Sequence, residues 1–269
     1  MLYKNSYISF IYNLPPNVIP FIAFLSLAYF IYKYIRLQLK TYSLENEFST
    51  IVNHTFRTPL TRIMWIAKEL EKDMSQNERL LSLQNLTNAT SRVLEIVDLI
   101  VGIKDIKNSA GYFFEAVSIR TLVEKSMTSH REEINKKGIS FTIPTFNNIP
   151  LLTVDLKKIS FVIDSVVENA IFYTQKDGKI AIDCKVNGGK MTISITDNGI
   201  GLSFMDKMRI FSRFYRSKEA YLLNTDGMGL RLYLSKQIIE RHHGKIYAIS
   251  KGRNKGTTFK IELPFNKNN

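Results

Sequence analysis

The sequence predicts three parts in succession: a single N-terminal transmembrane helix, an all-α helical hairpin and an α+β sandwich domain. An uncharged, largely apolar run lies near the N-terminus, and apolar residues then recur every three or four positions. Alternating strand and helix patterns fill the remainder. We place the boundaries at 1–36 for the tail and membrane helix, 37–108 for the hairpin, and 109–269 for the sandwich domain.

The composition excludes several classes of protein. With 45% hydrophobic residues, the chain has enough apolar side chains for packed cores and is not a disordered protein. The single cysteine, Cys184, excludes a disulfide scaffold and a cysteine-based zinc site. The net charge of +13 is spread along the chain rather than gathered in a block, so nucleic acid is not an expected partner. Anionic lipid headgroups or a nucleotide account for this charge equally well.

The N-terminal apolar run is typical of a membrane helix. No charged residue occurs from Asn5 to Tyr32, and Val18–Tyr32 is almost wholly apolar. Lys33, Arg36 and Lys40 follow the run, so the positive-inside rule predicts a single-pass protein of the cell (inner) membrane with a cytoplasmic C-terminal part. A buried core helix is the alternative.

The next segment has the pattern of two packed helices. Apolar or small residues recur with a spacing of three and four at Phe56, Leu60, Ile63, Ala67 and Leu70, and again at Leu83, Leu86, Thr90, Val93, Val97 and Ile100. We place the turn at Asp73–Asn77. Because such a hairpin exposes its apolar stripe, we expect a homodimeric four-helix bundle, with packing against the C-terminal domain as the alternative.

The C-terminal part alternates between helices and strands. Helices are expected at 119–137, 156–173 and 230–243, and strands at 139–143, 179–186, 191–197, 245–250 and 257–264. Asn187-Gly188-Gly189 predicts a hairpin turn between the second and third of these strands. The pattern predicts helices on one face of a mixed sheet.

Three segments of this part carry residues suited to binding a nucleotide. Asp197-Asn198-Gly199-Ile200-Gly201 follows a strand, where a carboxylate can accept a hydrogen bond from a ligand amino group. Gly227-Met228-Gly229-Leu230 opens a helix, whose unpaired N–H groups favour a phosphate. Glu168-Asn169-Ala170 lies within a helix and offers an amide oxygen to a cation such as Mg²⁺.

In order and separation, these three segments resemble the nucleotide boxes of the histidine-kinase ATPase family, which has the Bergerat-type fold. The resemblance implies ATP and Mg²⁺ as cofactors, with Asn169 as the Mg²⁺ ligand and Asp197 as the residue that reads adenine. It further implies that Gly199 and Gly201 line the base. The remaining expected nucleotide contacts are Phe211, Phe214 and Arg216 in a mobile lid, and Gly227, Gly229 and Leu230 at the triphosphate.

The hairpin carries a second resemblance. Residues 48–63, FSTIVNHTFRTPLTRI, look like the phosphoacceptor box of sensor histidine kinases. The resemblance implies that His54 is the phosphorylated residue, followed by Arg57, Thr58 and Pro59 as in the family. Thr58 stands where the family orients water for dephosphorylation of the partner protein. The two resemblances together cover the chain from about Thr41 to Pro264.

Four positions depart from the family pattern. Thr55 replaces the acidic residue that usually follows the acceptor histidine, and the loss of general-base help is worth about 10²- to 10⁴-fold. Ser165 replaces the first asparagine of the helical box, and Phe172 replaces a lysine that usually reaches the phosphates. Arg231 replaces the third glycine of the later box, and we expect its guanidinium to point at the phosphates.

These resemblances imply a membrane-anchored sensor histidine kinase, a dimeric enzyme that phosphorylates His54 from ATP. The implied partners are a second copy of the chain, membrane lipid, and a response regulator whose aspartate receives the phosphoryl group. The alternative is a nucleotide-binding regulator or phosphatase that has lost kinase activity through Thr55, Ser165 and Phe172. A mismatch-repair or chaperone ATPase of the same fold fits less well because of the His54 segment.

Overall fold

The computed structural model describes residues 26, 29–33, 50, 52–53, 55–105, 111–143, 149–223 and 227–265. Its internal contacts divide the chain into two units, 1–54 and 55–269. In the first unit residues 29–33 are helical, while the expected membrane helix Val18–Tyr32 lies largely outside the described residues. Among the residues that are described, no helix is long and apolar enough to cross a membrane.

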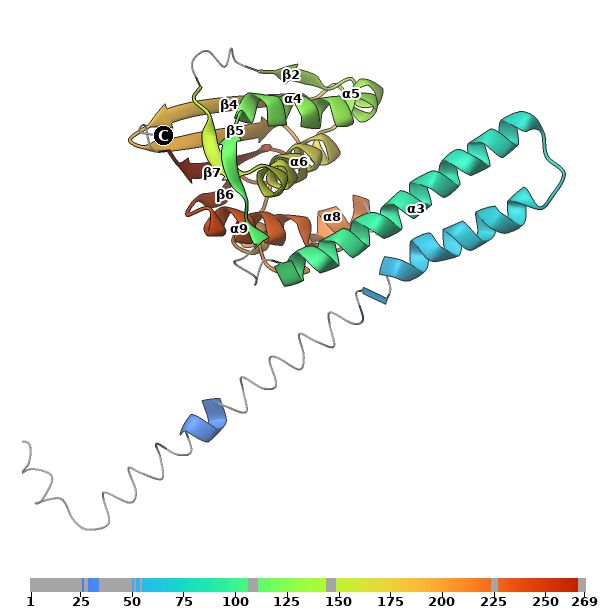
Figure 1. Ribbon diagram of the computed structural model, residues 1–269, viewed down its shortest axis with the longest axis horizontal. Coiled ribbons are helices and arrows are strands. Elements are labelled where there is room, and N and C mark those ends of the chain that lie inside the picture. Colours follow the sequence, from blue (N-terminus) through green and yellow to red (C-terminus); the bar gives the residue numbers. More distant parts are fainter. Residues whose placement is uncertain are drawn as a thin grey trace, which may run out of the picture. The chain divides into compact units, whose positions relative to one another are not determined.

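The second unit begins with the predicted helical hairpin (Figure 1). Residues 55–70 are helical, and helix α3 covers Gln76–Asp105. Ser75 starts α3 with a capping box, because the Glu78 amide donates to Ser75 Oγ while Ser75 N–H donates to Glu78 Oε2 over 2.9 Å. The break between the two helices covers residues 71–75, so the turn predicted at Asp73–Asn77 overlaps it but extends two residues into α3.

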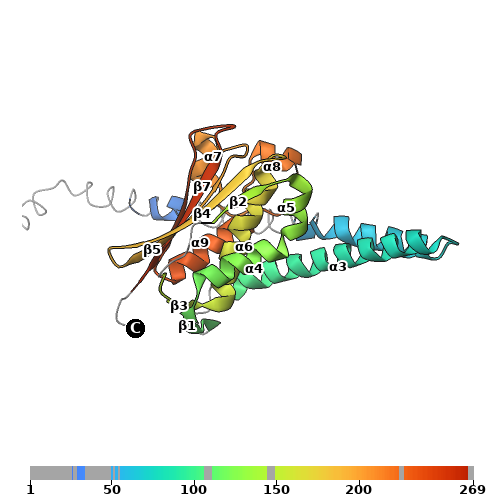
Figure 2. The same cartoon turned by 90° about the horizontal axis from the view of Figure 1, so that it is seen from above.

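The rest of this unit is a two-layer α+β sandwich, as predicted. A mixed five-stranded sheet has the order β2-β4-β5-β7-β6, and only β2 and β4 run parallel. Figure 2 shows α4, α6 and α9 as a layer on one face of this sheet. The five strands are β2 Ser140–Thr142, β4 Lys179–Asn187, β5 Lys190–Asp197, β6 Lys245–Ile249 and β7 Thr257–Pro264.

The helical layer follows the predicted segments, with one difference. The expected helix 119–137 is interrupted at His130, whose φ of −103° and ψ of 14° end one helix and begin the next. Gly138 then stops the second helix with a φ of 64°. The helices of this domain are α4 Ile119–Ser129, α5 Arg131–Lys137, α6 Leu156–Tyr173, α7 Phe204–Arg209, α8 Lys218–Leu223 and α9 Arg231–Arg241.

Four short elements were not predicted. Strands β1 Phe114–Val117 and β3 Leu152–Asp155 form a separate antiparallel pair, and α7 and α8 lie in the polar stretch before the glycine-rich loop. Asp155 ends β3 and caps α6, since its Oδ1 accepts the Lys158 amide at 2.9 Å. Its own amide donates to His242 Nε2 over 3.0 Å, so that buried histidine joins β3 to the end of α9.

The core lies between the sheet and the helical layer. In β5 every second residue is buried, and Met191, Ile193 and Ile195 are all fully covered. Helix α6 contributes the facing apolar surface through side chains with no exposure, among them Ile159, Ile163 and Val166. The lone Cys184 lies in β4, where burial and the neighbouring Asp183 carboxylate raise the pKa of its thiol to about 11. It therefore serves as a packing residue beside the core.

A polar cluster joins the break between α4 and α5 to α6. His130 Nε2 lies 3.1 Å from Asp164 Oδ1, and Ser126 Oγ donates to the same oxygen over 3.0 Å. The hydrogen bond with Asp164 raises the pKa of His130 against the opposing effect of burial. Burial raises the pKa of Asp164, but the bond from His130 and the charge of Arg231 outweigh it and lower the pKa overall.

We expect Ile193→Ala to lower the free energy of unfolding by about 2–5 kcal/mol, because it removes a wholly buried side chain from the central strand β5. Urea denaturation of the full chain measures this change. The control is Ile249→Ala in edge strand β6, where the side chain is 47% exposed. Equal losses in the two variants would contradict the placement of the core.

We expect His130→Gln to destabilise the chain more at pH 5.5 than at pH 9. Because the folded state raises the pKa of His130, its charged pairing with Asp164 stabilises most below the unfolded pKa of about 6.5 and fades as pH rises through the folded value. Urea unfolding at both pH values measures the difference. His243→Asn is the control, since His243 is exposed with a φ of 57° that asparagine tolerates. A loss independent of pH would show that the pairing is not charge-dependent.

Candidate functional site

One large cavity of the sandwich domain collects residues from five separate segments of that domain. These segments are α6, the end of β5 with the loop after it, the stretch around α8, the loop that precedes α9, and strand β7. Helix α3 of the hairpin adds Arg92, Glu95 and Leu99 to the wall. The predicted site residues that line it are Asn169, Asp197, Gly201, Arg216, Gly227, Gly229 and Leu230.

Asp197 reaches the cavity because it continues the alternation of β5. The residues two, four and six positions before it are buried and apolar, so the strand turns this carboxylate toward the helical layer just where the strand ends. Its Oδ1 accepts the amides of Gly199 at 2.9 Å and Thr257 at 3.2 Å. Burial raises the pKa of Asp197 despite these bonds. Both bonds end on Oδ1, which leaves Oδ2 as the oxygen for a ligand.

The α6 wall contains one predicted site residue and two family departures. Asn169 Nδ2 donates to the Ser165 carbonyl at 2.6 Å, so its amide oxygen is the atom suited to a cation. Ser165 is fully buried and donates to the Phe161 carbonyl over 2.7 Å, away from the cavity. Phe172 lines the cavity with an apolar ring in place of the family's lysine.

The loop before α9 is held by close backbone packing. Gly229 has a φ of 66°, and a Cβ there would lie 2.7 Å from the Tyr215 carbonyl oxygen. The Phe214 amide donates to the Gly229 carbonyl at 3.1 Å, which fixes this approach. Arg216 donates to the carbonyls of Gly227 at 3.0 Å and Ala220 at 2.8 Å, so it ties the loop to α8. Its guanidinium is thus engaged by backbone while it lines the cavity.

Three predicted nucleotide contacts do not line the cavity. A Cβ on Gly199 would lie 2.3 Å from the Tyr173 carbonyl oxygen, so this glycine serves the close packing of β5 against the end of α6. Phe211 packs edge-on against Phe259, at 6.3 Å between ring centroids. Phe214 adopts a φ of 62° in the turn that meets Gly229. These three residues instead pack against residues that line the cavity.

Arg231 lines the cavity, but its contacts do not support the expectation that it points at the phosphates. Its guanidinium does not stand free for phosphates, because it lies 2.6 Å from Glu95, 2.8 Å from Asp164 and 2.8 Å from Glu168. Sequence reasoning also missed the wall residues of α3 and Thr257. Strand pairing alone could have found Thr257, since it lies opposite Asp197 in the β5–β7 register.

A second cavity lies within the hairpin, beside the predicted phosphoacceptor segment. Its walls are Thr55, Thr58, Pro59, Arg62, Asn88, Ala89 and Arg92. Thr58 thus lines this cavity, whereas Arg57 is exposed and does not line it. His54 itself lies outside the described residues. Arg92 is a wall residue of both cavities.

The described residues offer no all-protein metal centre. Among them, no group of three or more His, Cys, Asp or Glu side chains is arranged to hold a metal ion. A divalent cation at Asn169 would need further oxygen ligands, and phosphate oxygens of a nucleotide are the kind that Mg²⁺ takes. The donor set at the cavity fits a cation that arrives with its nucleotide.

Comparison with known proteins agrees with this geometry. Residues 154–267 match the family described as histidine kinase-, DNA gyrase B- and HSP90-like ATPase. The sensor protein kinase WalK of Staphylococcus aureus is 32% identical over 227 residues, which cover 81% of this chain and 53% of that relative. The chain thus spans about half the length of this relative.

Two solved structures extend the comparison. The catalytic domain of histidine kinase ThkA is 29% identical with a TM-score of 0.50, covering 56% of this chain and 95% of that domain. A complex of ThkA with the response regulator protein TrrA has a TM-score of 0.62 at 24% identity, covers 87% of this chain and 66% of the solved one, and shows that the fold is shared. The chain's resemblance to sensor histidine kinases, and to their ATPase family over residues 154–267, is therefore confirmed.

Proposed function

We propose that this chain is a membrane-anchored sensor histidine kinase that phosphorylates itself on His54 from ATP and passes the phosphoryl group to an aspartate of a response regulator. The observation that carries this proposal is the single cavity, in which a buried carboxylate, a helical asparagine and a glycine-rich helix start converge from separate segments. The phosphoacceptor sequence in the preceding hairpin supports it. The response regulator is proposed by analogy with the ThkA complex.

Each wall of the cavity suits one part of ATP. Asp197 Oδ2 can accept the adenine amino group, while the backbone around Gly227 and Gly229 can approach the phosphates before α9 begins. The amide oxygen of Asn169 would hold a Mg²⁺ ion that arrives with the nucleotide. Bound there, Mg²⁺ supplies charge neutralisation during phosphoryl transfer. The protein's share is to hold the nucleotide and bring its terminal phosphate to an acceptor.

The hairpin surface supports a homodimer. Several members of the predicted stripe remain exposed within one chain, including Leu60 at 46%, Leu83 at 45% and Val97 at 40%. Other large apolar side chains of the hairpin are at least as open: Met64, Trp65, Leu80, Leu81, Leu94 and Val101. A monomer rarely leaves so much apolar surface in water, and a second hairpin would cover it. Attachment to the membrane rests on the uncharged run 5–32 alone.

A second candidate function is a nucleotide-binding regulator or phosphatase with little kinase activity. Three observations favour it: Phe172 presents a ring to the cavity where the family presents a lysine, Ser165 faces away from the cavity, and Thr55 cannot act as a carboxylate base. Thr58 lines the hairpin cavity and remains available for orienting water. The experiment on His54 below separates the two candidates.

We expect Asp197→Asn to weaken ATP binding about 10- to 100-fold, because a charged acceptor is lost beside the adenine amino group. Calorimetric titration of the full chain measures the dissociation constant, and thermal unfolding shows whether the variant is folded. Asp183→Asn is the matched control, since Asp183 lies in β4 outside the cavity wall and pairs with Lys185 over 3.0 Å. Equal affinity of the unaltered chain for ATP and GTP would contradict the role of Asp197 in reading the base.

We expect the full chain, incubated with γ-labelled ATP and Mg²⁺, to take up a label that is acid-labile and stable in base. His54→Ala should lose this label to background, at least about 100-fold, because the acceptor nitrogen is removed. His243→Asn, which changes an exposed histidine outside both cavities to a residue that tolerates its φ of 57°, should keep it. A label that persists in His54→Ala contradicts the assigned acceptor. No label with ATP binding retained favours the second candidate.

A further inference from the structure

Arg231 connects three helices of the second unit. It is the first residue of α9, directly after the glycine-rich loop. One guanidinium nitrogen donates to Glu95 on α3 over 2.6 Å, and the other donates to Asp164 on α6 over 2.8 Å. That second nitrogen also lies 2.8 Å from Glu168 Oε2, in an ion pair without hydrogen-bond geometry. Of these contacts, only the one to Glu95 reaches the helical hairpin.

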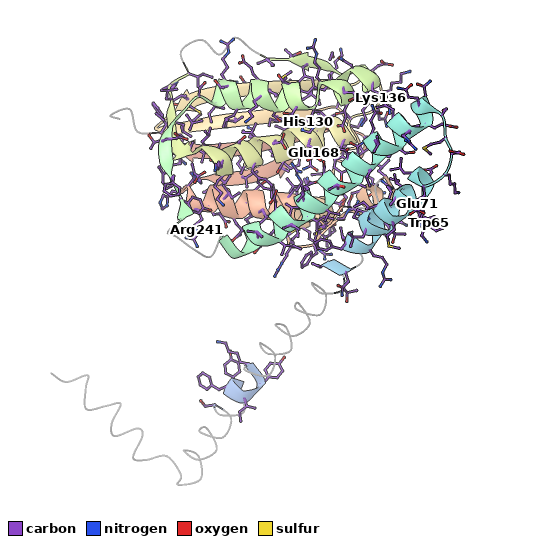
Figure 3. All side chains as sticks on the ribbon, turned by 45° about the vertical axis from the view of Figure 1, so that its right-hand side comes forward. Trp65, Glu71, His130, Lys136, Glu168 and Arg241 are labelled. Atoms are coloured by element: carbon purple, nitrogen blue, oxygen red, sulfur yellow. The ribbon has the colours of Figure 1, made fainter. Side chains whose placement is uncertain are left out.

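The contacts with Asp164 and Glu168 on α6 hold the guanidinium of Arg231 in place. Asp164 and Glu168 are one turn apart on α6, so both carboxylates lie on the same face of that helix. Asp164 is itself held by His130, and Figure 3 shows His130 and Glu168 on the side of the helical layer that α3 crosses. Arg231 is only 22% exposed. It therefore presents a pre-oriented cation to α3.

The partner of that cation lies between the two cavities. Glu95 pairs with Arg231 on one side and with Arg92, one turn earlier on α3, on the other. Arg92 and Glu95 line the nucleotide cavity, and Arg92 also lines the hairpin cavity with Thr55. Thr55 directly follows the proposed acceptor His54. This stretch of α3 thus separates the nucleotide cavity from the phosphoacceptor segment.

We propose that Arg231 and Glu95 form the positioning contact that docks the ATPase domain on helix α3 for phosphoryl transfer to the hairpin. The inference rests on the proposed function and specifies how its two halves meet. Phosphoryl transfer depends chiefly on the placement of donor and acceptor, and a misplacement of about 1 Å costs about 100-fold in rate. A charged contact between a rigidly held arginine and α3 supplies such placement.

We expect Glu95→Gln to lower the rate of autophosphorylation at saturating ATP by about tenfold or more, with the dissociation constant of ATP changed less than about twofold. The substitution keeps the size of the side chain and removes only its charge. Asp98→Asn is the matched control, because Asp98 is an exposed carboxylate one turn further along the same helix. It should match the unaltered chain in both measurements. Glu95→Asp, which keeps the charge, should retain more of the rate than Glu95→Gln.

Three results would overturn the proposal. An unchanged rate would make the ion pair a surface contact without consequence, and a raised rate would make it a restraint on transfer. An equal loss in ATP affinity would place Glu95 in nucleotide binding instead. Hydrogen exchange of the α3 and α9 amides reports docking separately from chemistry, and we expect lower protection in Glu95→Gln than in Asp98→Asn.

The exchange measurement also separates this inference from the proposed function. If the unaltered chain takes up no label, the histidine kinase function fails, and docking is judged by exchange alone. Reduced protection in Glu95→Gln would then support the contact between Arg231 and α3. Equal protection in both variants would overturn it.

Discussion

The site depends on the burial of helix α6 between the sheet and its neighbouring helices. One face of α6 carries residues such as Ile159, Ile163 and Val167, which have no exposure at all. Because that apolar face cannot rotate away from the sheet without exposing its side chains to water, the opposite face is fixed as well. Asn169 and Glu168 are thereby presented to the cavity, and Asp164 to α9 and the α4–α5 break. The backbone of Gly199 packs closely against the carbonyl of Tyr173 at the end of α6. This contact places the Asp197 carboxylate, at the end of β5, beside α6.

The fixed orientation of α6 places two carboxylates, Asp164 and Glu168, close together, and Arg231 is the cation that pairs with both. Glu168 lines a cavity proposed to hold a triphosphate, and burial raises the pKa of Glu168 against the lowering effect of Arg231. Two carboxylates one turn apart beside a polyanion would repel it, and one guanidinium between them offsets that repulsion. The replacement of the family's third glycine by arginine is therefore intelligible only together with Glu168 and Asp164. The contacts of Arg231 with Asp164 and Glu168 thus neutralise this wall, while its contact with Glu95 carries the proposed docking on α3.

Much of the architecture followed from sequence because it is encoded locally. Helix α6 and the hairpin show three-and-four spacing, and the β4–β5 hairpin carries its own glycine turn, so their existence and extents were predictable. Strands β1 and β3 have four residues each, too few for alternation to be read. The partners of Arg231 were not predictable, since Glu95 lies 136 positions away in sequence. Gly199 was predicted to contact the ligand for a related reason. A side chain is excluded there by the carbonyl of Tyr173, which is distant in sequence.

The arginine at the start of α9 also constrains how this chain can change through evolution. A glycine at position 231 would leave the carboxylates of Asp164 and Glu168 without their shared counter-ion, at positions where burial opposes charge. Loss of either acid first would instead leave the guanidinium underpaired. Replacing Arg231 alone, or either acid alone, is thus unfavourable for stability, although replacing all of them together need not be. Because Glu95, Asp164, Glu168 and Arg231 share one network of ion pairs, substitutions at these four positions are expected to have non-additive effects on stability.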